Sequence, residues 1–334
     1  MRLIQLNHPE QNRRVAVVKT DQLDLIDPAY PTCYDLFSAI ISDDRTPGGF
    51  IPDVLSGEQL DYDPIYRGIS DWKIMPAFDH PHSPLMCMLS GTGLTHKASA
   101  ENRQNMHQKK KGDELTDSMK IYLWGEEAGK PDKGDIGVQP EWFYKGNGTG
   151  LRAYGEPLQV PPYADDGGEE PEIAGLYMIS EEGVPFRVGF AIANEFSDHI
   201  MEKKNYLYLA PSKLRECAIG PELILDHEFR NVSGRVSIKR DGEEIWSETI
   251  KSGESNMCHS LENLEHHHFK YEQHRIPGTV HIHFFGADAF SFGAGVKLED
   301  GDLMTVEFEE FGRPLTNPVF INPENEALVR VSKP

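Results

Sequence analysis

The spacing of hydrophobic residues divides the chain into a short unit and a longer one. Residues 2–6 and 14–18 alternate apolar and polar side chains, and residues 33–41 repeat apolar side chains at helical spacing. Several prolines between residues 76 and 84 then interrupt the pattern, before a short apolar run that is typical of a buried strand. We therefore predict a small N-terminal α/β domain over residues 1–80 and a second domain over residues 81–334.

The second domain is predicted to be mainly β, which makes the whole chain an α+β protein. Runs of β-branched and aromatic residues recur between turn residues, at 142–145, 173–179, 187–193, 223–227, 235–240, 279–285 and 303–308. Asp241-Gly242 is a strong signal for a hairpin between two strands. Residues 97–134 are instead polar and include the run Lys109-Lys110-Lys111, so we expect a mobile lid there.

The composition narrows the class of protein. With 54 Asp and Glu residues against 33 Lys and Arg, the formal charge of -21 repels phosphate groups and disfavours nucleic acid or an anionic membrane as partner. No apolar run approaches the roughly 18 residues of a membrane span. The cysteines are far apart in the sequence and the N-terminus is unlike a signal peptide, so we expect reduced thiols and a cytoplasmic protein.

Two carboxylates form the sharpest local feature of the sequence. Glu170 and Glu172 stand where a predicted strand begins, and side chains at positions i and i+2 of a strand face the same way. Such a pair, about 7 Å apart along the strand, can share one hard cation, whereas Glu169 would face the opposite side. The alternative interpretation is a solvated turn in an acidic protein.

A third carboxylate, Glu195, ends the apolar run at residues 187–193. A carboxylate at the end of a buried strand needs a partner, which makes Glu195 a candidate third ligand. The neighbouring Asn194, Ser197 and Asp198 are more typical of helix caps. Three carboxylates favour Mg²⁺, Mn²⁺ or Ca²⁺ over zinc, because hard ions prefer oxygen ligands.

Four segments, in this order, resemble the fumarylacetoacetate hydrolase superfamily. They are the Glu-x-Glu pair, the stretch from Gly189 to Glu195, the segment of Lys213 that ends in Gly220-Pro221, and residues 298–319, which end in Asn-Pro-Val. The resemblance covers roughly residues 85–320. The resemblance implies a mixed β-sandwich roll behind a small N-terminal α/β domain, usually paired as a homodimer.

The resemblance also implies roles for single residues. The metal ligands fall on Glu170, Glu172 and Glu195, the last at a position that Asp occupies more often. Lys213 would stabilise an enolate or move a proton. Lys145 would pair with a carboxylate or oxyanion of the substrate.

The family's general base falls on His96, but the sequence departs from the family pattern nearby. The acid that usually follows the histidine in the next turn is replaced by Ser99. The nearest acid is Glu101, so a catalytic pair of His96 and Glu101 is a candidate and not an established match.

A second departure lies at residues 286–288, in the place of the family's substrate loop. The backbone amides of Gly286 and Ala287 are still able to bind anionic oxygen. Asp288 in this place suggests a polyhydroxylated substrate.

Two groups of histidines elsewhere in the chain could suggest a second metal site. We do not predict one. His266, His267 and His268 are adjacent, so a helix would spread them around its surface. His281 and His283 share one face of a predicted strand, where hydrogen-bonded core or interface histidines are the more common occurrence.

These features predict a divalent-metal-dependent enzyme that acts on a small 2-oxo acid through a stabilised enolate. Three segments differ from the commoner family motifs, namely residues 90–96 (SGTGLTH), 194–199 (NEFSDH) and 283–288 (HFFGAD). They resemble the subgroup that dehydrates 2-keto-3-deoxy sugar acids such as 2-keto-3-deoxy-L-arabonate. Two alternatives remain open at this point: a C-C bond hydrolase of acylpyruvates or fumarylacetoacetate-like substrates, and a non-catalytic metal-dependent binding module for sugar acids.

Overall fold

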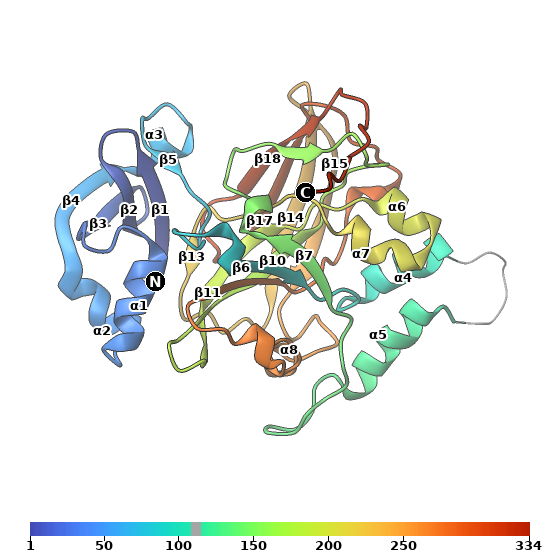
Figure 1. Cartoon of the computed structure of the whole chain (residues 1–334), viewed down its shortest axis with the longest axis horizontal. Helices are drawn as coiled ribbons and strands as arrows, with labels where there is room; N and C mark the ends of the chain where they lie inside the picture. Colours follow the sequence, from blue (N-terminus) through green and yellow to red (C-terminus); the bar gives the residue numbers. More distant parts are fainter. Residues whose placement is uncertain (108–114) are drawn as a thin grey trace.

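The computed structural model describes residues 1–107 and 115–334, which are built mainly from strands with a smaller number of helices (Figure 1). The strands form two sheets, one of 13 strands and one of 5. The prediction of an α+β protein rich in β structure is therefore confirmed.

The larger sheet joins strands from both ends of the chain. Its main path follows the order β4 (Leu55–Asp61), β3 (Gln22–Ile26), β2 (Asn12–Val18), β1 (Arg2–His8), β13 (Leu223–Ile224), β11 (Pro185–Asn194), β10 (Pro171–Ile179), β16 (Val280–Phe284), β6 (Cys87–Gly91) and β7 (Phe143–Asn147). The short strands β5 (Lys73–Ile74), β8 (Leu151–Arg152) and β12 (Cys217–Ile219) branch from this path. Because β1 pairs with β13, the N-terminal unit is joined to the rest of the chain by main-chain hydrogen bonds.

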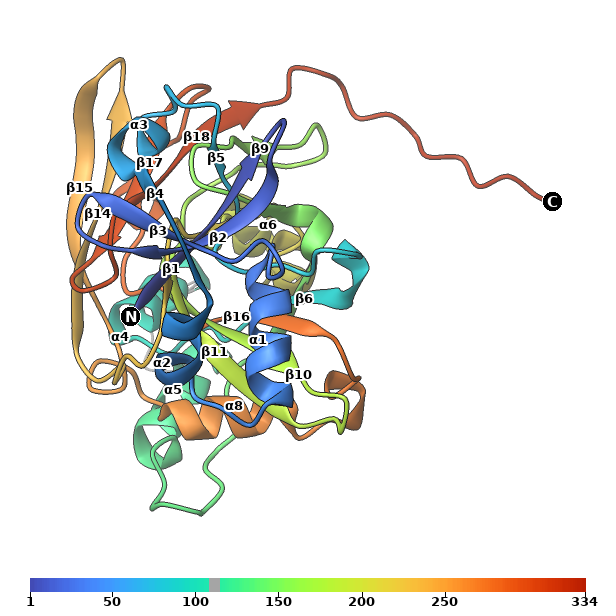
Figure 2. The same ribbon diagram turned by 90° about the vertical axis from the view of Figure 1, so that its left-hand side faces the viewer.

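The smaller sheet has the order β15 (Glu243–Ser252), β14 (Val232–Arg240), β17 (Leu303–Phe308), β18 (Leu315–Ile321) and β9 (Leu158–Val160). Strands β14 and β15 form the predicted hairpin, in which Arg240 pairs with Glu243. Asp241 and Gly242 both have positive φ, 51° and 86°, as a two-residue turn of this kind requires. Figure 2 shows this hairpin along one side of the molecule.

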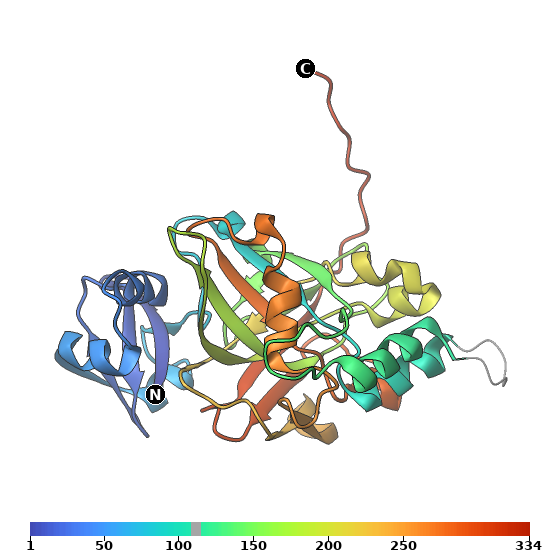
Figure 3. The ribbon, with the colours of Figure 1, turned by 90° about the horizontal axis from the view of Figure 1, so that it is seen from below.

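The helices gather in three places (Figures 1 and 3). Helices α1 (Cys33–Ser42), α2 (Pro47–Phe50) and α3 (Tyr62–Tyr66) belong to the N-terminal unit, and α8 (Leu261–Phe269) lies against the larger sheet. Helices α4 (Lys97–His107), α5 (Asp117–Ala128), α6 (His199–Lys204) and α7 (Leu209–Ser212) lie at the end of the molecule away from the N-terminal unit. No helix in the described ranges has the length and apolar character that crossing a membrane requires.

The segment predicted as a polar lid contains two helices, α4 and α5. Their apolar side chains are few but well placed, because Met119 and Tyr122 are spaced i, i+3 and are buried on one face of α5. They pack with Ala100 of α4, Leu94 and Cys258 in a small cluster. The run Lys109-Lys110-Lys111 lies outside the described residues.

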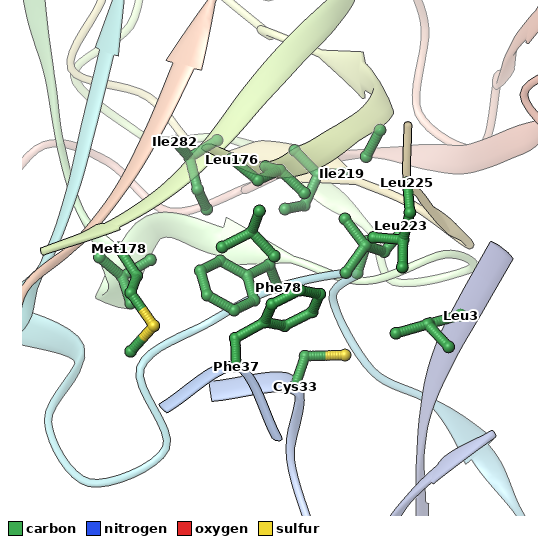
Figure 4. Close-up of a cluster of buried hydrophobic side chains, with 14 of the residues drawn as sticks. Leu3, Cys33, Phe37, Phe78, Leu176, Met178, Ile219, Leu223, Leu225 and Ile282 are labelled. Carbon is green, nitrogen blue, oxygen red and sulfur yellow. The ribbon is translucent and has the colours of Figure 1, made fainter. Parts of the chain in front are cut away.

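The main hydrophobic core extends across the boundary predicted near residue 80. Leu3, Cys33 and Phe37 from the N-terminal unit belong to the same buried cluster as Leu176 and Ile282 of the central strands. Figure 4 shows these side chains on both sides of the Phe37 and Phe78 rings. The N-terminal unit thus shares its core, as well as its sheet, with the rest of the chain.

Glu222 ties three distant parts of the chain together. Its side chain has no exposed surface, and it accepts hydrogen bonds from Arg2 Nη1 at 2.8 Å, the Tyr62 hydroxyl at 3.1 Å and the Arg313 backbone N-H at 3.1 Å. The Gly312 backbone packs against this carboxylate so closely that a Cβ there would lie 2.3 Å from Glu222 Oε2. One buried carboxylate therefore satisfies donors from β1, α3 and the turn before β18.

We predict that Glu222→Ala lowers the free energy of unfolding by about 3–5 kcal/mol, because it leaves buried donors and a partly buried cation unpaired. Urea denaturation measures this loss. The control is Glu310→Ala, whose carboxylate is 80% exposed beside His227 and should change stability by less than about 0.5 kcal/mol. Equal effects of the two substitutions would contradict the role given to Glu222.

Candidate metal centre and active site

The pairing of β10 with β11 brings the three predicted metal ligands together. The strands are antiparallel, so the start of β10 lies beside the end of β11, with Glu172 opposite Ala193. Glu170 immediately precedes β10 and Glu195 immediately follows β11. The Glu195 backbone N-H donates to the Glu170 carbonyl at 2.9 Å, which continues the ladder by one further bond.

The carboxylates of Glu170, Glu172 and Glu195 form the one group of three or more His, Cys, Asp or Glu side chains in the described residues with metal-binding geometry. One oxygen from each residue lies within 4.8 Å of the others, and all three residues are buried. Glu195 Oε1 is buried and accepts no hydrogen bond from the described part of the chain. An unsatisfied anionic oxygen beside two other carboxylates fits a hard divalent cation well.

Burial, together with the nearby carboxylates, raises the pKa of two of these groups. Burial, reinforced by the charges of Glu195 and Glu170, raises the pKa of Glu172 well above its ordinary value. Burial also raises the pKa of Glu195 to about 7, against the opposing charge of Lys213. A divalent cation would relieve this repulsion, because it favours the ionised form of every carboxylate around it.

Two buried lysines compensate part of the negative charge. Lys213, which follows α7, donates from Nζ to Glu170 Oε1 and Oε2 at 2.7 and 2.6 Å and to Glu195 Oε2 at 3.4 Å. Burial lowers the pKa of Lys213, but Glu170 and Glu195 outweigh it and raise that pKa above its ordinary value. Burial would raise the pKa of Glu170, yet Lys213 and His199 hold it well below the usual range. Lys213 and Glu170 are therefore a charged pair.

Lys145, on β7, has a different environment. Its Nζ donates to the main-chain carbonyls of Phe196 at 2.7 Å and Lys213 at 3.0 Å, and it lies 3.6 Å from Glu195 Oε1. Its side chain has no exposed surface. Burial lowers the pKa of Lys145 despite the nearby charge of Glu195. In this structure Lys145 thus fixes the backbone around Glu195 and Lys213, and the substrate contact predicted for it remains a prediction.

His199 is a site residue that the sequence did not single out. It opens α6, four residues after Glu195, and its Nε2 lies 3.0 Å from Glu170 Oε1. The ring stacks on Phe290 with centroids 4.8 Å apart, and a Cβ on Gly168 would collide with it at 2.5 Å. Burial lowers the pKa of His199, but the hydrogen bond to Glu170 outweighs it and the pKa is raised. In the sequence, Asp198 is recognisable as a helix cap, but no pattern marked the next residue, His199, as part of the site.

Two glutamates of the acidic motif fasten the loop that follows β16. The Gly286 backbone N-H donates to Glu172 Oε2 at 2.7 Å. Glu169 accepts from the Ser291 backbone N-H at 2.5 Å and from its hydroxyl at 2.8 Å, so it binds the same loop as Glu172. Gly286 has a φ of 93°, and a Cβ there would lie 2.2 Å from Thr95 Oγ1, so this position requires glycine. The loop is therefore held against the carboxylates at both ends.

A small cavity opens beside the carboxylates. Its walls come from five parts of the chain, and the residues that line it are Gly93, Ser99, Arg103, Glu170, Glu172, His199, Glu202, Lys213, Gly286, Ala287 and Phe290. The free space is about 20 Å³, which is room for about one water molecule or one ion. A sugar acid needs a site of several hundred Å³, so its entry requires the walls to move.

Arg103 of α4 holds one wall of the cavity closed. Its Nη1 donates to both oxygens of Glu141 at 2.7 and 2.8 Å, and its Nε lies 2.6 Å from Glu202 Oε1 on α6. Burial lowers the pKa of Arg103, but Glu141 and Glu202 more than offset this and raise it. These ion pairs connect the predicted lid with α6, the helix that begins at His199. No sequence motif distinguished Arg103 or its two partners.

Some predicted site residues lie apart from this cavity. His96 is buried and does not line it; its Nδ1 lies 2.9 Å from Thr95 Oγ1, and burial lowers its pKa to about 4. Glu101 is exposed and forms an ion pair with Lys97, so the structure does not bring it to His96. Asp288 accepts a hydrogen bond from the Lys251 backbone N-H at 2.9 Å and turns toward β15. Of the predicted loop residues, Gly286 and Ala287 do line the cavity.

The histidines of β16 are hydrogen-bonded core residues, as predicted. His283 lies 2.9 Å from Ser90 Oγ and 2.8 Å from Thr92 Oγ1. His281 Nδ1 lies 2.9 Å from His268 Nε2. Burial lowers the pKa of His281 and His283 to about 3, which keeps both rings neutral.

Solved structures of other proteins share this fold. The solved apo structure of 2-keto-3-deoxy-D-arabinonate dehydratase superposes with a TM-score of 0.69 at 20% identity, and covers 97% of this chain and 100% of that one. A structure of that enzyme complexed with magnesium and 2,5-dioxopentanoate gives a TM-score of 0.68 at 19% identity over the same shares. The chain has the fold of the 2-keto-3-deoxyarabinonate dehydratases.

More distant relatives agree with this fold. The 5-carboxymethyl-2-hydroxymuconate delta-isomerase from Mycobacterium smegmatis gives a TM-score of 0.57 at 17% identity, covering 96% of this chain and 100% of that one. This chain and these solved structures therefore share one fold.

One sequence relative matches about half of the chain. A probable 2-keto-3-deoxyxylonate dehydratase from Haloferax volcanii is 24% identical over 186 residues, which are 54% of this chain and 60% of that protein. The match therefore spans less than two thirds of the relative's length. No protein-family model matches the sequence.

We predict that Mg²⁺ binds more tightly as the pH rises through about 7, because protons compete with the ion for Glu195, whose pKa is about 7. Protons occupy the carboxylate below this pH and leave it above, so the dissociation constant should fall roughly tenfold from pH 6 to pH 8. Isothermal titration calorimetry measures it, and Glu195→Gln should weaken binding and flatten this dependence. A dissociation constant that does not change with pH would rule out the competition.

Proposed function

We propose that this protein is a divalent-metal-dependent hydro-lyase that dehydrates a 2-keto-3-deoxy sugar acid. The observation that carries the proposal is the buried group of Glu170, Glu172 and Glu195 in contact with Lys213, next to a cavity. The same fold occurs in 2-keto-3-deoxy-D-arabinonate dehydratase, one structure of which contains magnesium and 2,5-dioxopentanoate. Both facts favour Mg²⁺ and a 2-oxo acid as ligands.

The residues that would hold the metal are Glu170, Glu172 and Glu195. When bound, the ion supplies positive charge to the carboxylate and keto oxygens of a 2-oxo acid, which acidifies the protons at C3. Gly286 and Ala287 line the same cavity. Because the Gly286 N-H already donates to Glu172, the Ala287 amide is the group that would bind an anionic oxygen of the substrate. Lys213 adds positive charge where negative charge develops on the substrate.

We assign proton transfer to His199 and Lys213, because both line the cavity and both contact Glu170. Dehydration removes a proton from C3 and returns one to the hydroxide that leaves C4, so it needs both a base and an acid near the substrate. His96, the base implied by the family resemblance, is buried outside this lining.

Substrate entry would require the first part of the predicted lid, α4, to move. Ser99 and Arg103 of α4 close a cavity that holds about 20 Å³, and the Arg103 ion pairs with Glu141 and Glu202 are the contacts that would break. Closure afterwards would exclude water that competes for the intermediate. We propose that the whole lid comprises residues 97–134, the range predicted from the sequence.

The proposal includes the remaining expectations for the chain. Residues 1–80 would form the small N-terminal domain and residues 81–334 the catalytic domain with its sandwich-like roll. The enzyme would act in the cytoplasm, in the catabolism of sugar acids, as a homodimer.

The proposed activity is tested with purified protein and Mg²⁺ on two substrate panels. We expect a 2-keto-3-deoxypentonate to yield the semialdehyde product, and acylpyruvates to release no pyruvate. Glu170→Ala should abolish turnover, while its circular dichroism spectrum matches the wild type. Pyruvate release from acylpyruvates alone would identify a hydrolase, and tight metal-dependent binding without turnover would identify a binding module. Either result, or full activity of Glu170→Ala, would overturn the proposal.

The assignment of proton transfer is tested by comparing His199→Gln with His96→Gln. We expect His199→Gln to lower kcat by about 10²–10⁴-fold, the usual contribution of a proton-transfer group, and His96→Gln to retain activity within about tenfold. Exchange of the C3 protons of pyruvate in D₂O, followed by NMR, reports the proton-removal step by itself. The opposite ranking of the two variants would return the role of base to His96.

A further inference from the structure

The last residues of the chain form an exposed arm. Residues 323–334 follow β18 without helix or strand, and Figures 2 and 3 show them leading away from the body. Three apolar side chains on this arm, Leu328, Val329 and Val331, are 84%, 88% and 94% exposed. Burying such apolar side chains stabilises a protein or a complex. The arm points away from the body of its own chain, so a second molecule would have to bury them.

A groove near the root of the arm exposes apolar side chains of its own. It has a volume of about 360 Å³, and among the residues that line it Tyr144, Tyr163 and Leu214 are 44%, 53% and 47% exposed. The segment leading toward Leu214 adds three exposed side chains, those of Tyr206, Leu207 and Tyr208. Exposed tyrosines beside aliphatic side chains are typical of protein interfaces.

The arm begins at the rim of this groove. Strand β18, which precedes the arm, pairs with β9, and the Asn322 backbone N-H donates to the Val160 carbonyl at 3.0 Å. Gln159 and Pro161, on either side of Val160, both line the groove. The groove and the root of the arm therefore lie on the same face, so two copies with these faces opposed present each arm to the other copy's groove.

We propose that residues 323–334 of one copy of this chain dock in the groove of a second copy, and that the two copies exchange arms around a two-fold axis. Such an arrangement is self-complementary, because the same arm and the same groove are used twice. Twelve extended residues reach at most about 40 Å, enough to cross an interface. This inference does not depend on the proposed activity.

Charge favours the arm as the element that crosses between copies. Two whole chains of charge -21 repel each other, whereas the arm carries Glu324 and Glu326 against Arg330 and Lys333 and has no net side-chain charge. Both signs also border the groove, since Arg215 and Glu216 line it. The arm therefore brings apolar surface to a second copy without adding repulsion.

The test uses cysteine cross-linking between two distinguishable copies. The four native cysteines are all buried, so an introduced surface cysteine reacts selectively. A tagged Val329→Cys variant is mixed with an untagged Leu214→Cys variant and treated with a short bismaleimide. We expect a covalent heterodimer of one tagged and one untagged chain on a denaturing gel.

The matched control replaces the groove variant by Ile69→Cys, which places an equally reactive cysteine on the N-terminal unit, at a position 77% exposed. We expect no heterodimer in this mixture. Equal cross-linking in both mixtures would overturn the proposal. So would a Val329→Cys/Leu214→Cys double variant that cross-links only within one chain, because the arm would then fold back on its own groove.

Sedimentation velocity gives an independent measurement on the uncross-linked protein. Burial of each Leu or Val side chain is worth roughly tenfold in a dissociation constant. Leu328→Asp/Val331→Asp should therefore raise the dimer dissociation constant by about 100-fold or more, and deletion of residues 323–334 should do the same. Glu324→Gln, on the same arm, is the control and should leave it unchanged. A wild-type protein that stays monomeric, or a dimer that survives the deletion, would overturn the proposal.

Discussion

The repulsion among three buried carboxylates is the constraint on which the site depends. Glu170, Glu172 and Glu195 cannot move apart, because the pairing of β10 with β11 sets their separation. Four groups around the carboxylates reduce this repulsion: two buried lysines, the imidazole of His199 and the Gly286 amide. Strand register, and not loop flexibility, therefore fixes the geometry that a metal would find.

The same carboxylates organise the parts of the site that must contact a substrate. Glu172 and Glu169 accept hydrogen bonds from Gly286 and Ser291, two positions of the loop that follows β16. Another part of the cavity wall is helix α4, in which Arg103 forms ion pairs with Glu141 and Glu202. Breaking these side-chain contacts would let α4 move away from the cavity.

Much of the fold and of the metal centre was predictable from local patterns. The alternation that predicted β1 and β2, and the Asp241-Gly242 turn, depend on neighbours within a few residues, where sequence signals are strong. Glu170 and Glu172 were found because the i, i+2 spacing places two charges on one face. The residues 223–227 were predicted as one strand, but β13 ends at Ile224, and Asp226 has a φ of 55°.

The residues that were not found depend on packing between distant segments. Arg103 and Glu202 lie on α4 and α6, Glu141 lies in the segment before β7, and no spacing in the sequence relates them. His199 looked like the ordinary first residue of a helix behind the cap residue Asp198, and its role is visible only when Glu170 lies beside it. The helices of residues 97–134 were missed because their buried faces carry only a few apolar side chains.

The order of strands in the larger sheet affects how the chain is made. Strand β1 pairs with β13, more than 200 residues later, and β6 pairs with β16, which lies about as far along. During synthesis the N-terminal strands leave the ribosome first. The part of β1 that pairs with β13 stays without its partner strand until residue 224 has also been made. Pairings of such long sequence separation slow folding, so the nascent chain is a natural client for chaperones.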